Sequence, residues 1–338
     1  MNSNLTSVQN NWLKNFFEIN SFGEIIGSDQ LRIESSQRKF FRIKSSKNSL
    51  ILMIVPPGIE ESVSSFVTKG NYFHKYDVNV PQIYASDEDL GLILVEDFGD
   101  KIYQFNIEEA PDKFYELAIN ELIKIQSIDK NNMLFKKLDF EIFEMNWNLF
   151  EKYFFDNFLG MSDKKLLNQI KEGYKFVCNQ LSLQPEVICH YDFECRNLIY
   201  TKDKKAGILD FQDAVIGPIG LDLASLFKDL YYDWPEEKIV DWYSKYNEKL
   251  KRILNIELNL ESLVKFIDFA SIQRQVRILG KLSQVYEQLN RSERLKDFHK
   301  LINYLKNTSE KYSELENFSY SIAILKEPLK IKLEKIFS

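Results

Sequence analysis

The sequence contains little cysteine and little histidine. It has three residues of each type among 338, no C-x-x-C pair, and histidines that lie far apart. A disulfide framework and a zinc site built from Cys and His are therefore disfavoured, and buried reduced thiols are expected. The residues concerned are Cys178, Cys189, Cys195, His74, His190 and His299.

Long hydrophobic runs and an excess of positive charge are also missing. The longest apolar run, "LILMIV" at 50–55, is far too short to span a bilayer, and the first residues lack the basic start and apolar core of a signal peptide. The net charge of -6 argues against general nucleic-acid binding, because such binding neutralises phosphates with clustered Lys and Arg. We expect a cytoplasmic protein with no nucleic-acid or membrane partner.

The hydrophobic content of 44% and the charged content of 28% predict a globular chain, and its patterning predicts two parts. Strand patterns occur in 28–55 and 81–97, around a helical pattern at 60–76. Further helices are expected at 8–19, 110–128, 140–159, 161–181 with Ser162 as N-cap, 222–232, 236–252, 260–289 and 293–314. The predicted fold is α+β, with a small five-stranded N-terminal lobe (1–95), a hinge (96–100) and a large helical C-terminal lobe (101–338).

One stretch places polar side chains at the ends of two apolar strand patterns. In "VICHYDFECRNLIYTKDKKAGILDF", residues 187–211, "LIY" and "AGILDF" flank a turn and predict a hairpin. The hairpin would bring Asp192, Asn197 and Asp210 toward one point. Carboxylate and amide oxygens of this kind suit magnesium better than zinc.

The spacing of these three residues matches a kinase signature. H-x-D-x-x-x-x-N followed by D-F is the pattern of a catalytic loop and a metal-binding aspartate. Phosphoryl transfer requires metal ions at the phosphates and a carboxylate that orients the attacking hydroxyl. We therefore predict that Asp192 faces the acceptor hydroxyl and that Asn197 and Asp210 hold Mg²⁺, with ATP as donor.

Several blocks of the chain resemble a known family. They are "SSQRKFFRI", "MIVPPGIEE", "LILVEDFGD", "GILDFQDAVIGPIGLDLASLFKD" and "SIQRQVRILG", which span about residues 30 to 310. The chain is similar to the aminoglycoside phosphotransferase/choline kinase superfamily, whose fold is protein-kinase-like and bilobal. Within it, the "DFQDA…GP…DLASL" block resembles the anomeric kinases of N-acetylmuramate and N-acetylglucosamine in peptidoglycan recycling.

The resemblance implies roles for individual residues. It implies that Asp192 is the catalytic base and that Asn197 and Asp210 hold magnesium. It implies that Asp222 braces the catalytic loop, that His190 is structural, and that backbone groups of Glu96 and Phe98 read adenine. Asp213 could face the sugar or a second metal, or it could be a surface or capping residue.

The chain departs from the kinase pattern at the phosphates. Met53 stands where the third strand usually carries a lysine, and the phosphate-covering loop, "IESSQRKFF", has no glycine. Backbone and side-chain donors of this loop would replace the glycine-rich loop, and one of its cations would replace the lysine. The candidate donors are Ser35, Ser36 and Gln37, and the candidate cations are Arg38 and Lys39.

Two segments bear on the acceptor. In 146–155 the aromatic side chains of Trp147, Phe150 and Phe154 lie at helical spacing, which favours a core role. The alternative is that Glu144 and Tyr153 reach the cleft and contact a sugar. Arg274 is either a solvated or ion-paired helix residue or a substrate clamp.

The predicted function is ATP-dependent phosphorylation of a sugar hydroxyl by a monomer, on the anomeric hydroxyl of N-acetylmuramate or N-acetylglucosamine. Residues 211–221 are too few for the activation segment that docks a polypeptide on a protein kinase, so a small-molecule sugar is the expected partner. Two alternatives remain open: an aminoglycoside- or choline-type O-phosphotransferase, and a non-catalytic nucleotide-binding module.

Overall fold

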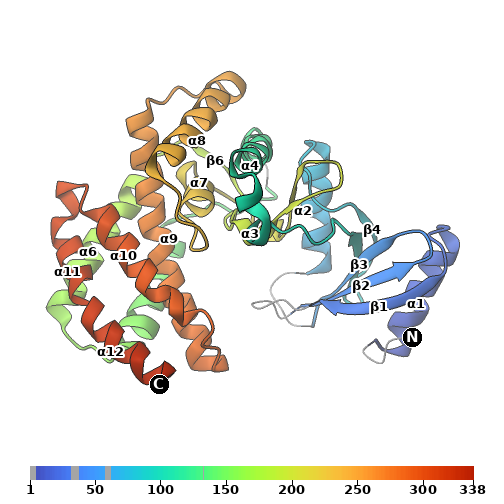
Figure 1. The fold of residues 1–338 in the computed structure, drawn as a ribbon, viewed down its shortest axis with the longest axis horizontal. Coiled ribbons are helices and arrows are strands. Elements are labelled where there is room, and N and C mark those ends of the chain that lie inside the picture. Colours follow the sequence, from blue (N-terminus) through green and yellow to red (C-terminus); the bar gives the residue numbers. More distant parts are fainter. Residues whose placement is uncertain (1–4, 32–37, 58–61, 132) are drawn as a thin grey trace. The chain divides into compact units, whose positions relative to one another are not determined.

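The computed structural model describes residues 5–31, 38–57, 62–131 and 133–338. It divides into two compact units that interleave along the chain (Figure 1). Unit 1 comprises Met1–Ile125 and Cys195–Asp213, and unit 2 comprises Gln126–Glu194 and Ala214–Ser338. The chain therefore passes from unit 2 into unit 1 within the predicted catalytic loop, and it returns directly after Asp213.

Unit 1 is built around a five-stranded antiparallel sheet with the strand order β1-β2-β3-β5-β4. This sheet confirms the expected strand-rich N-terminal lobe, and with the helical unit 2 it confirms the α+β fold class. The hinge predicted at 96–100 stays a prediction. The strands are β1 (Ile25–Leu31), β2 (Lys39–Ser45), β3 (Ser49–Ile54), β4 (Ile83–Asp87) and β5 (Leu92–Glu96).

One face of this sheet packs against helix α1 (Ser7–Ile19). The helix begins at Thr6 with a capping box, in which the Thr6 hydroxyl accepts from the Gln9 N–H and the Gln9 side chain accepts from the Thr6 N–H. Its apolar stripe is buried with Phe41 and Leu52 of the sheet. From Phe40 to Ser45 in β2, more exposed and buried side chains alternate, as expected for a strand with one covered face, whereas β3 also buries Met53 on its other face.

Further helices of unit 1 lie between β3 and β4 in the chain and after β5. They are α2 (Val63–Lys75), α3 (Tyr103–Asn106), the short 3₁₀ turn η1 (Ile107–Glu109) and α4 (Pro111–Gln126), which ends at the border of unit 2. The hydroxyl of Ser62 caps α2 by accepting from the Ser65 N–H. This helix matters for the site because it packs against the segment that follows Asp210.

The predicted hairpin around the polar cluster is confirmed. Strand β7 (Leu198–Tyr200) pairs antiparallel with β8 (Ala206–Ile208), and Lys204 turns the chain with a φ of 61°. The 3₁₀ turns η3 (Cys195–Asn197) and η4 (Phe211–Asp213) flank the hairpin. In unit 2, β6 (Glu186–Cys189) pairs with β9 (Val215–Pro218), so each unit carries one short strand pair from this region.

Unit 2 is otherwise helical and is organised around the long helix α9 (Leu260–Leu289), which contacts α5, α6, α7, α8 and α10 (Figure 1). Helix α6 begins after Asp163, whose carboxylate accepts from two backbone N–H groups, so the prediction of Ser162 as N-cap was wrong by one residue. The helices are α5 (Phe140–Leu149), α6 (Lys164–Leu181), α7 (Gly220–Phe227), α8 (Glu236–Lys249), α9, α10 (Phe298–Ser309), α11 (Glu316–Ile324) and α12 (Lys326–Phe337), with the 3₁₀ turns η6 (Leu295–Asp297) and η7 (Ser313–Leu315).

The aromatic helix at 140–159 changes its geometry halfway. It is an α-helix to Leu149 and a π-helix over Phe150–Phe158 (η2), and a second π-helical turn, η5 (Leu250–Leu254), extends α8. The change coincides with a close approach to α9: a Cβ added to Gly280 would lie 2.5 Å from the Phe150 nitrogen. Trp147, Phe150 and Phe154 are buried, which confirms their core role.

Two further expectations can be compared with the described residues. Cys178, Cys189 and Cys195 are in no disulfide and are buried, the setting expected for reduced thiols. Across the part of the chain that is described, no helix has the length and apolar character needed to cross a membrane.

Candidate active site

The hairpin brings Asn197 and Asp210 together in unit 1. The Leu209 N–H donates to the Asn197 carbonyl at 2.9 Å, so the two ends of the hairpin lie side by side. Asp210 is exposed and has a φ of 59°, a left-handed conformation that Asp tolerates better than most residues. The Gln212 side chain donates to Asp210 Oδ1 at 2.7 Å. One carboxylate oxygen is thus held in place beside Asn197.

This donor set suits magnesium in a particular way. Among the described residues, no cluster of three or more His, Cys, Asp or Glu side chains forms a metal cage. Mg²⁺ is commonly held by one or two protein oxygens together with substrate phosphates and water. A carboxylate and an amide at the end of a hairpin fit an ion that arrives with a nucleotide, and they do not fit a resident structural metal.

Helix α2 fixes the segment that follows Asp210. The ring of Phe211 is fully buried and packs against Phe66 at 4.7 Å and Phe73 at 5.8 Å between ring centroids. Gly70 lies under the same ring, and a Cβ there would come within 3.2 Å of it. The Lys69 ammonium group donates to the Gln212 carbonyl, two residues from Asp210. No sequence pattern indicated Lys69, because it lies more than 140 residues from Gln212 along the chain.

The two candidate cations, Arg38 and Lys39, have different surroundings. Burial lowers the pKa of Arg38, and the charges of Asp210 and Asp213 act in the opposite direction, which places the Arg38 guanidinium within their field. The Lys39 side chain is exposed. Arg38 is therefore the better candidate for the charge that the buried Met53 cannot supply. The predicted donors Ser35, Ser36 and Gln37 lie outside the described residues.

The predicted adenine-binding segment is anchored from within unit 1. Arg42 in β2 forms ion pairs with Asp97 at 2.7 Å and Asp100 at 2.8 Å. The Glu96 N–H donates to the Gln82 carbonyl, so a contact between the Glu96 backbone and adenine would have to use its carbonyl. Phe98 is buried, with its ring close to β8. The adenine-reading role of Glu96 and Phe98 stays a prediction.

The other half of the predicted site, residues 190–194, belongs to unit 2. Asp222 in α7 is fully buried, and its two carboxylate oxygens accept from the His190 N–H at 2.7 Å and the Tyr191 N–H at 2.9 Å. His190 is also fully buried, and its ring packs edge-on against Phe193 at 5.6 Å. These contacts have the form expected of a bracing acid and a structural histidine.

The loop carries a strained backbone where Asp222 holds it. Tyr191 has a φ of 81°, which is an outlier for a bulky residue. Such conformations persist where surrounding contacts over-determine them, and they concentrate at functional sites. Here the Asp222 contact fixes the Tyr191 N–H, and Asp192 follows directly in the chain.

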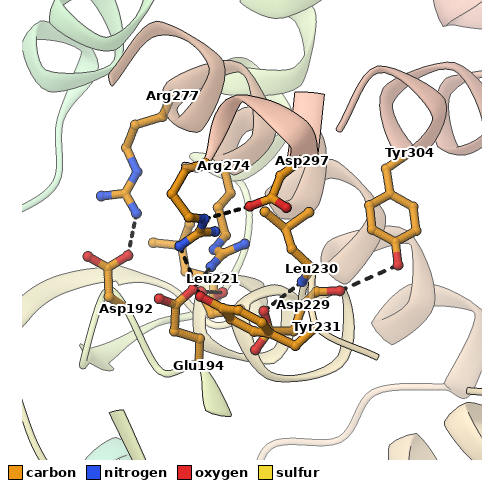
Figure 2. Close-up of polar contacts among 12 residues, drawn as sticks. Asp192, Glu194, Leu221, Asp229, Leu230, Tyr231, Arg274, Arg277, Asp297 and Tyr304 are labelled. Atoms are coloured by element: carbon orange, nitrogen blue, oxygen red, sulfur yellow. Dashed lines mark hydrogen bonds and ion pairs between the residues drawn. The ribbon is translucent and has the colours of Figure 1, made fainter. Parts of the chain in front are cut away.

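Helix α9 contacts this loop through two arginines. Arg277 is paired with Asp192, and Arg274 is paired with Glu194 (Figure 2). The Arg277 guanidinium also lies 4.2 Å from the centroid of the Tyr191 ring. Arg277 was missed by the sequence analysis, although it stands in the quoted block "SIQRQVRILG". Asp192 lies in unit 2 and Asn197 and Asp210 in unit 1, so their convergence stays a prediction.

The residues predicted to contact the sugar lie in different environments. Arg274 is buried and ion-paired, Glu144 is exposed on α5, and Tyr153 is half-buried on η2 with its hydroxyl 3.5 Å from the Gln288 side chain. Asp213 is exposed in unit 1, near Arg38. Their roles toward a sugar stay predictions, and the ion-paired alternative for Arg274 is the one its contacts match.

Asp222→Asn is expected to remove a pH dependence of stability. Burial raises the pKa of Asp222 from 3.8 to about 6, although His190 and the two backbone N–H groups oppose the shift. The folded protein therefore binds this proton more tightly than the unfolded chain does. Stability from this group is greatest below the unfolded pKa and falls as pH rises through the folded pKa, by at most about 3 kcal/mol.

Denaturant unfolding of both proteins at about pH 4.5 and pH 7.5 would measure this effect. The free energy of unfolding of the wild type, minus that of Asp222→Asn, should shrink as the pH rises. A difference that stays constant or grows would contradict the raised pKa.

The fold and the site agree with the family to which the chain belongs. The sequence profile of the phosphotransferase enzyme family matches residues 29–252, which is more than half of the chain. The chain therefore belongs to the phosphotransferase enzyme family. This membership confirms the predicted enzyme class, a phosphotransferase with an alcohol group as acceptor.

Named relatives match along nearly the whole chain. An N-acetylmuramate/N-acetylglucosamine kinase of Neisseria meningitidis serogroup B is 28% identical over 312 residues, which cover 90% of this chain and 91% of the relative. The enzyme of the same name from Pseudomonas aeruginosa is 26% identical over 321 residues and 93% of each chain. The predicted resemblance is thus confirmed.

Solved structures share the fold at lower identity. The choline kinase LicA from Streptococcus pneumoniae has a TM-score of 0.63 at 17% identity, covering 88% of this chain and 99% of its own. The ADP-bound aminoglycoside phosphotransferase APH(2'')-Ib has a TM-score of 0.60 at 15% identity, covering 87% of this chain and 98% of its own. At these identities the comparison bears on the fold alone.

Proposed function

We propose that the protein is an ATP-dependent kinase that phosphorylates the anomeric hydroxyl of N-acetylmuramate or N-acetylglucosamine and gives a sugar 1-phosphate. The observation that carries the kinase part is that the chain contains both an H-x-D loop braced by Asp222 and a hairpin that begins after Asn197 and ends before Asp210. The support for the acceptor is the name shared by relatives that cover 90% or more of this chain.

The residues proposed to bind the nucleotide and Mg²⁺ lie in unit 1. Bound Mg²⁺ would neutralise charge on the triphosphate, and Asn197 and Asp210 are the residues that would hold it. Arg38 would add a further positive charge near the phosphates, because it already lies in the field of Asp210 and Asp213. Related folds solved with ADP or AMP support a nucleotide as donor.

The residue proposed to act on the acceptor hydroxyl, Asp192, lies in unit 2. Asp192 would accept the hydrogen bond of the acceptor hydroxyl and take its proton as the phosphoryl group transfers. The anomeric hydroxyl of a free sugar is more acidic than its other hydroxyls, so a carboxylate of low basicity suffices as the base. Positioning of the two reactants would supply much of the rate acceleration.

Turnover against a panel of acceptors tests the proposal. The panel contains N-acetylmuramate, N-acetylglucosamine, an aminoglycoside and choline, with ADP release as the rate and NMR of the product as the assignment. We expect the two amino sugars to turn over and the phosphorus to couple to the anomeric proton.

The methyl glycoside of N-acetylglucosamine is the matched control, because it keeps the ring and lacks the anomeric hydroxyl. Its phosphorylation at the rate of the free sugar would show that transfer goes to another hydroxyl. Turnover of only choline or the aminoglycoside would reject the amino-sugar acceptor while keeping the kinase. An absence of turnover with every acceptor would favour a non-catalytic nucleotide-binding module.

A further inference from the structure

Helix α9 contacts the predicted catalytic loop through two ion pairs with different surroundings (Figure 2). The side chains of Arg274 and Glu194 are only 4% and 7% exposed, so this pair lies within the core of unit 2. The side chains of Arg277 and Asp192 are 17% and 29% exposed. The second pair therefore reaches the surface, where a substrate can meet it, and it includes the carboxylate proposed as the base.

The Arg277 guanidinium is held from two directions. It donates from Nη2 to Asp192 Oδ1, and its flat face lies over the Tyr191 ring at 4.2 Å from the centroid, within the range of a cation–π contact. Tyr191 is itself fixed through its N–H by Asp222. The guanidinium, the ring and the carboxylate thus form one packed unit on a braced backbone.

The charge of Arg277 is permanent in this setting. Burial alone would lower the pKa of the Arg277 guanidinium, but the neighbouring Asp192, together with Tyr191 and Glu194, raises it above its ordinary value. Arginine does not give up its proton in proteins, so Arg277 cannot be the base. It can donate hydrogen bonds and fix the orientation of a partner.

We propose that Arg277 is a positioning residue for phosphoryl transfer: it holds Oδ1 of Asp192 and so fixes the orientation in which the carboxylate meets the acceptor hydroxyl. This inference rests on the proposed function, because it needs Asp192 to be the base. The terminal torsion of an aspartate is broad, so an unpaired carboxylate would sample many orientations. With the carboxylate held by Arg277, the proton of the acceptor hydroxyl passes to the carboxylate, and no proton is exchanged with Arg277.

A double-mutant cycle distinguishes this role from a merely structural ion pair. Arg277→Ala should lower kcat by about 10- to 100-fold, since misplacing a reacting group has effects of this size, and it should leave the KM for ATP within about threefold. The loss must not exceed that of Asp192→Asn. In the double variant the two losses should not multiply, because Arg277 acts only through the carboxylate that Asp192→Asn removes.

Arg277→Lys supplies the conservative comparison. It keeps the charge but loses the planar fork that binds a carboxylate, so it should recover part of the lost kcat. Lys265→Ala is the matched control, because Lys265 is another α9 cation that lies over an aromatic ring, 5.4 Å from the Phe269 centroid, and that pairs with an acid. It should leave kcat unchanged.

The outcomes distinguish a failure of the role proposed for Arg277 from a failure of the proposed kinase function. If wild-type turnover is present and Arg277→Ala matches it, or if the two losses multiply in the double variant, Arg277 is not the positioning residue and the kinase assignment stands. If the wild type turns over no acceptor on the panel, the proposed function fails and the role of Arg277 fails with it. Thermal melts of each variant check that the folded fraction is the same in every assay.

Discussion

Asp192→Asn is expected to keep the fold and the affinity for ATP while losing turnover. A positioned general base contributes roughly 100- to 10,000-fold to a rate, and asparagine keeps the shape of aspartate without its ability to take a proton. Its carbonyl oxygen can still accept from Arg277, so the contact with α9 is retained in part. The loss should therefore fall on kcat, measured as ADP release with the acceptor at saturation.

Nucleotide affinity of the same variant provides the internal check. Calorimetry with MgATP should give the same dissociation constant for Asp192→Asn as for the wild type, within about threefold, because Asp192 is not assigned to the metal. Asp241→Asn, which removes an exposed carboxylate on α8, should be indistinguishable from the wild type in both assays. Near wild-type kcat in Asp192→Asn would remove it from the catalytic role.

The parts of the site that sequence predicted well are those set by local patterns. Two short apolar runs around a polar turn were enough to predict the hairpin of β7 and β8, and hence the neighbourhood of Asn197 and Asp210. The same holds for α9, which runs over the predicted residues 260–289. Hydrophobic periodicity and turn chemistry determine such elements within a few residues of chain.

The contacts of the catalytic loop with α9 could not be predicted in this way. Arg277 is 85 residues from Asp192, and the pair depends on how α9 packs against α7, the helix that carries Asp222. The helix carries two arginines three positions apart, so both lie on one face, and local pattern does not tell which one meets which acid. Of the two arginines, only Arg274 was a candidate from the sequence, and the structure pairs it with Glu194.

Other differences between the predicted and the observed structure also have specific physical causes. Ser162 and Asp163 are adjacent residues of the type that caps helices, and only the geometry shows that Asp163 accepts the N–H groups. The π-helix at Phe150–Phe158 accompanies the approach of Gly280, a tertiary contact. Helices α11 and α12 were not predicted, although buried side chains at Phe318, Ile322, Leu325, Leu329 and Leu333 recur at helical spacing, so that signal was present and overlooked.

Asp210→Asn is expected to abolish the dependence of nucleotide affinity on magnesium. Asparagine is chosen because Asp210 has a φ of 59°, which Asn also tolerates, whereas most residues would add backbone strain there. It can still meet the Gln212 side chain, but it lacks the charge that holds a divalent cation next to a triphosphate. Second-layer changes around metal ligands already cost about 10- to 100-fold in metal affinity, so loss of the ligand charge should cost at least as much.

Calorimetric titration of ATP with Mg²⁺, and of ATP with EDTA, measures the effect in both proteins. The wild type should bind much more tightly with Mg²⁺, and Asp210→Asn should show the same weak affinity under both conditions. Asp203→Asn is the control, because Asp203 is an exposed carboxylate in the turn of the same hairpin and its removal should leave the Mg²⁺ dependence intact. Equal Mg²⁺ dependence in Asp210→Asn and the wild type would mean that the cation is held elsewhere. The exposed Asp213, which lies near Arg38, would then be the first carboxylate to test.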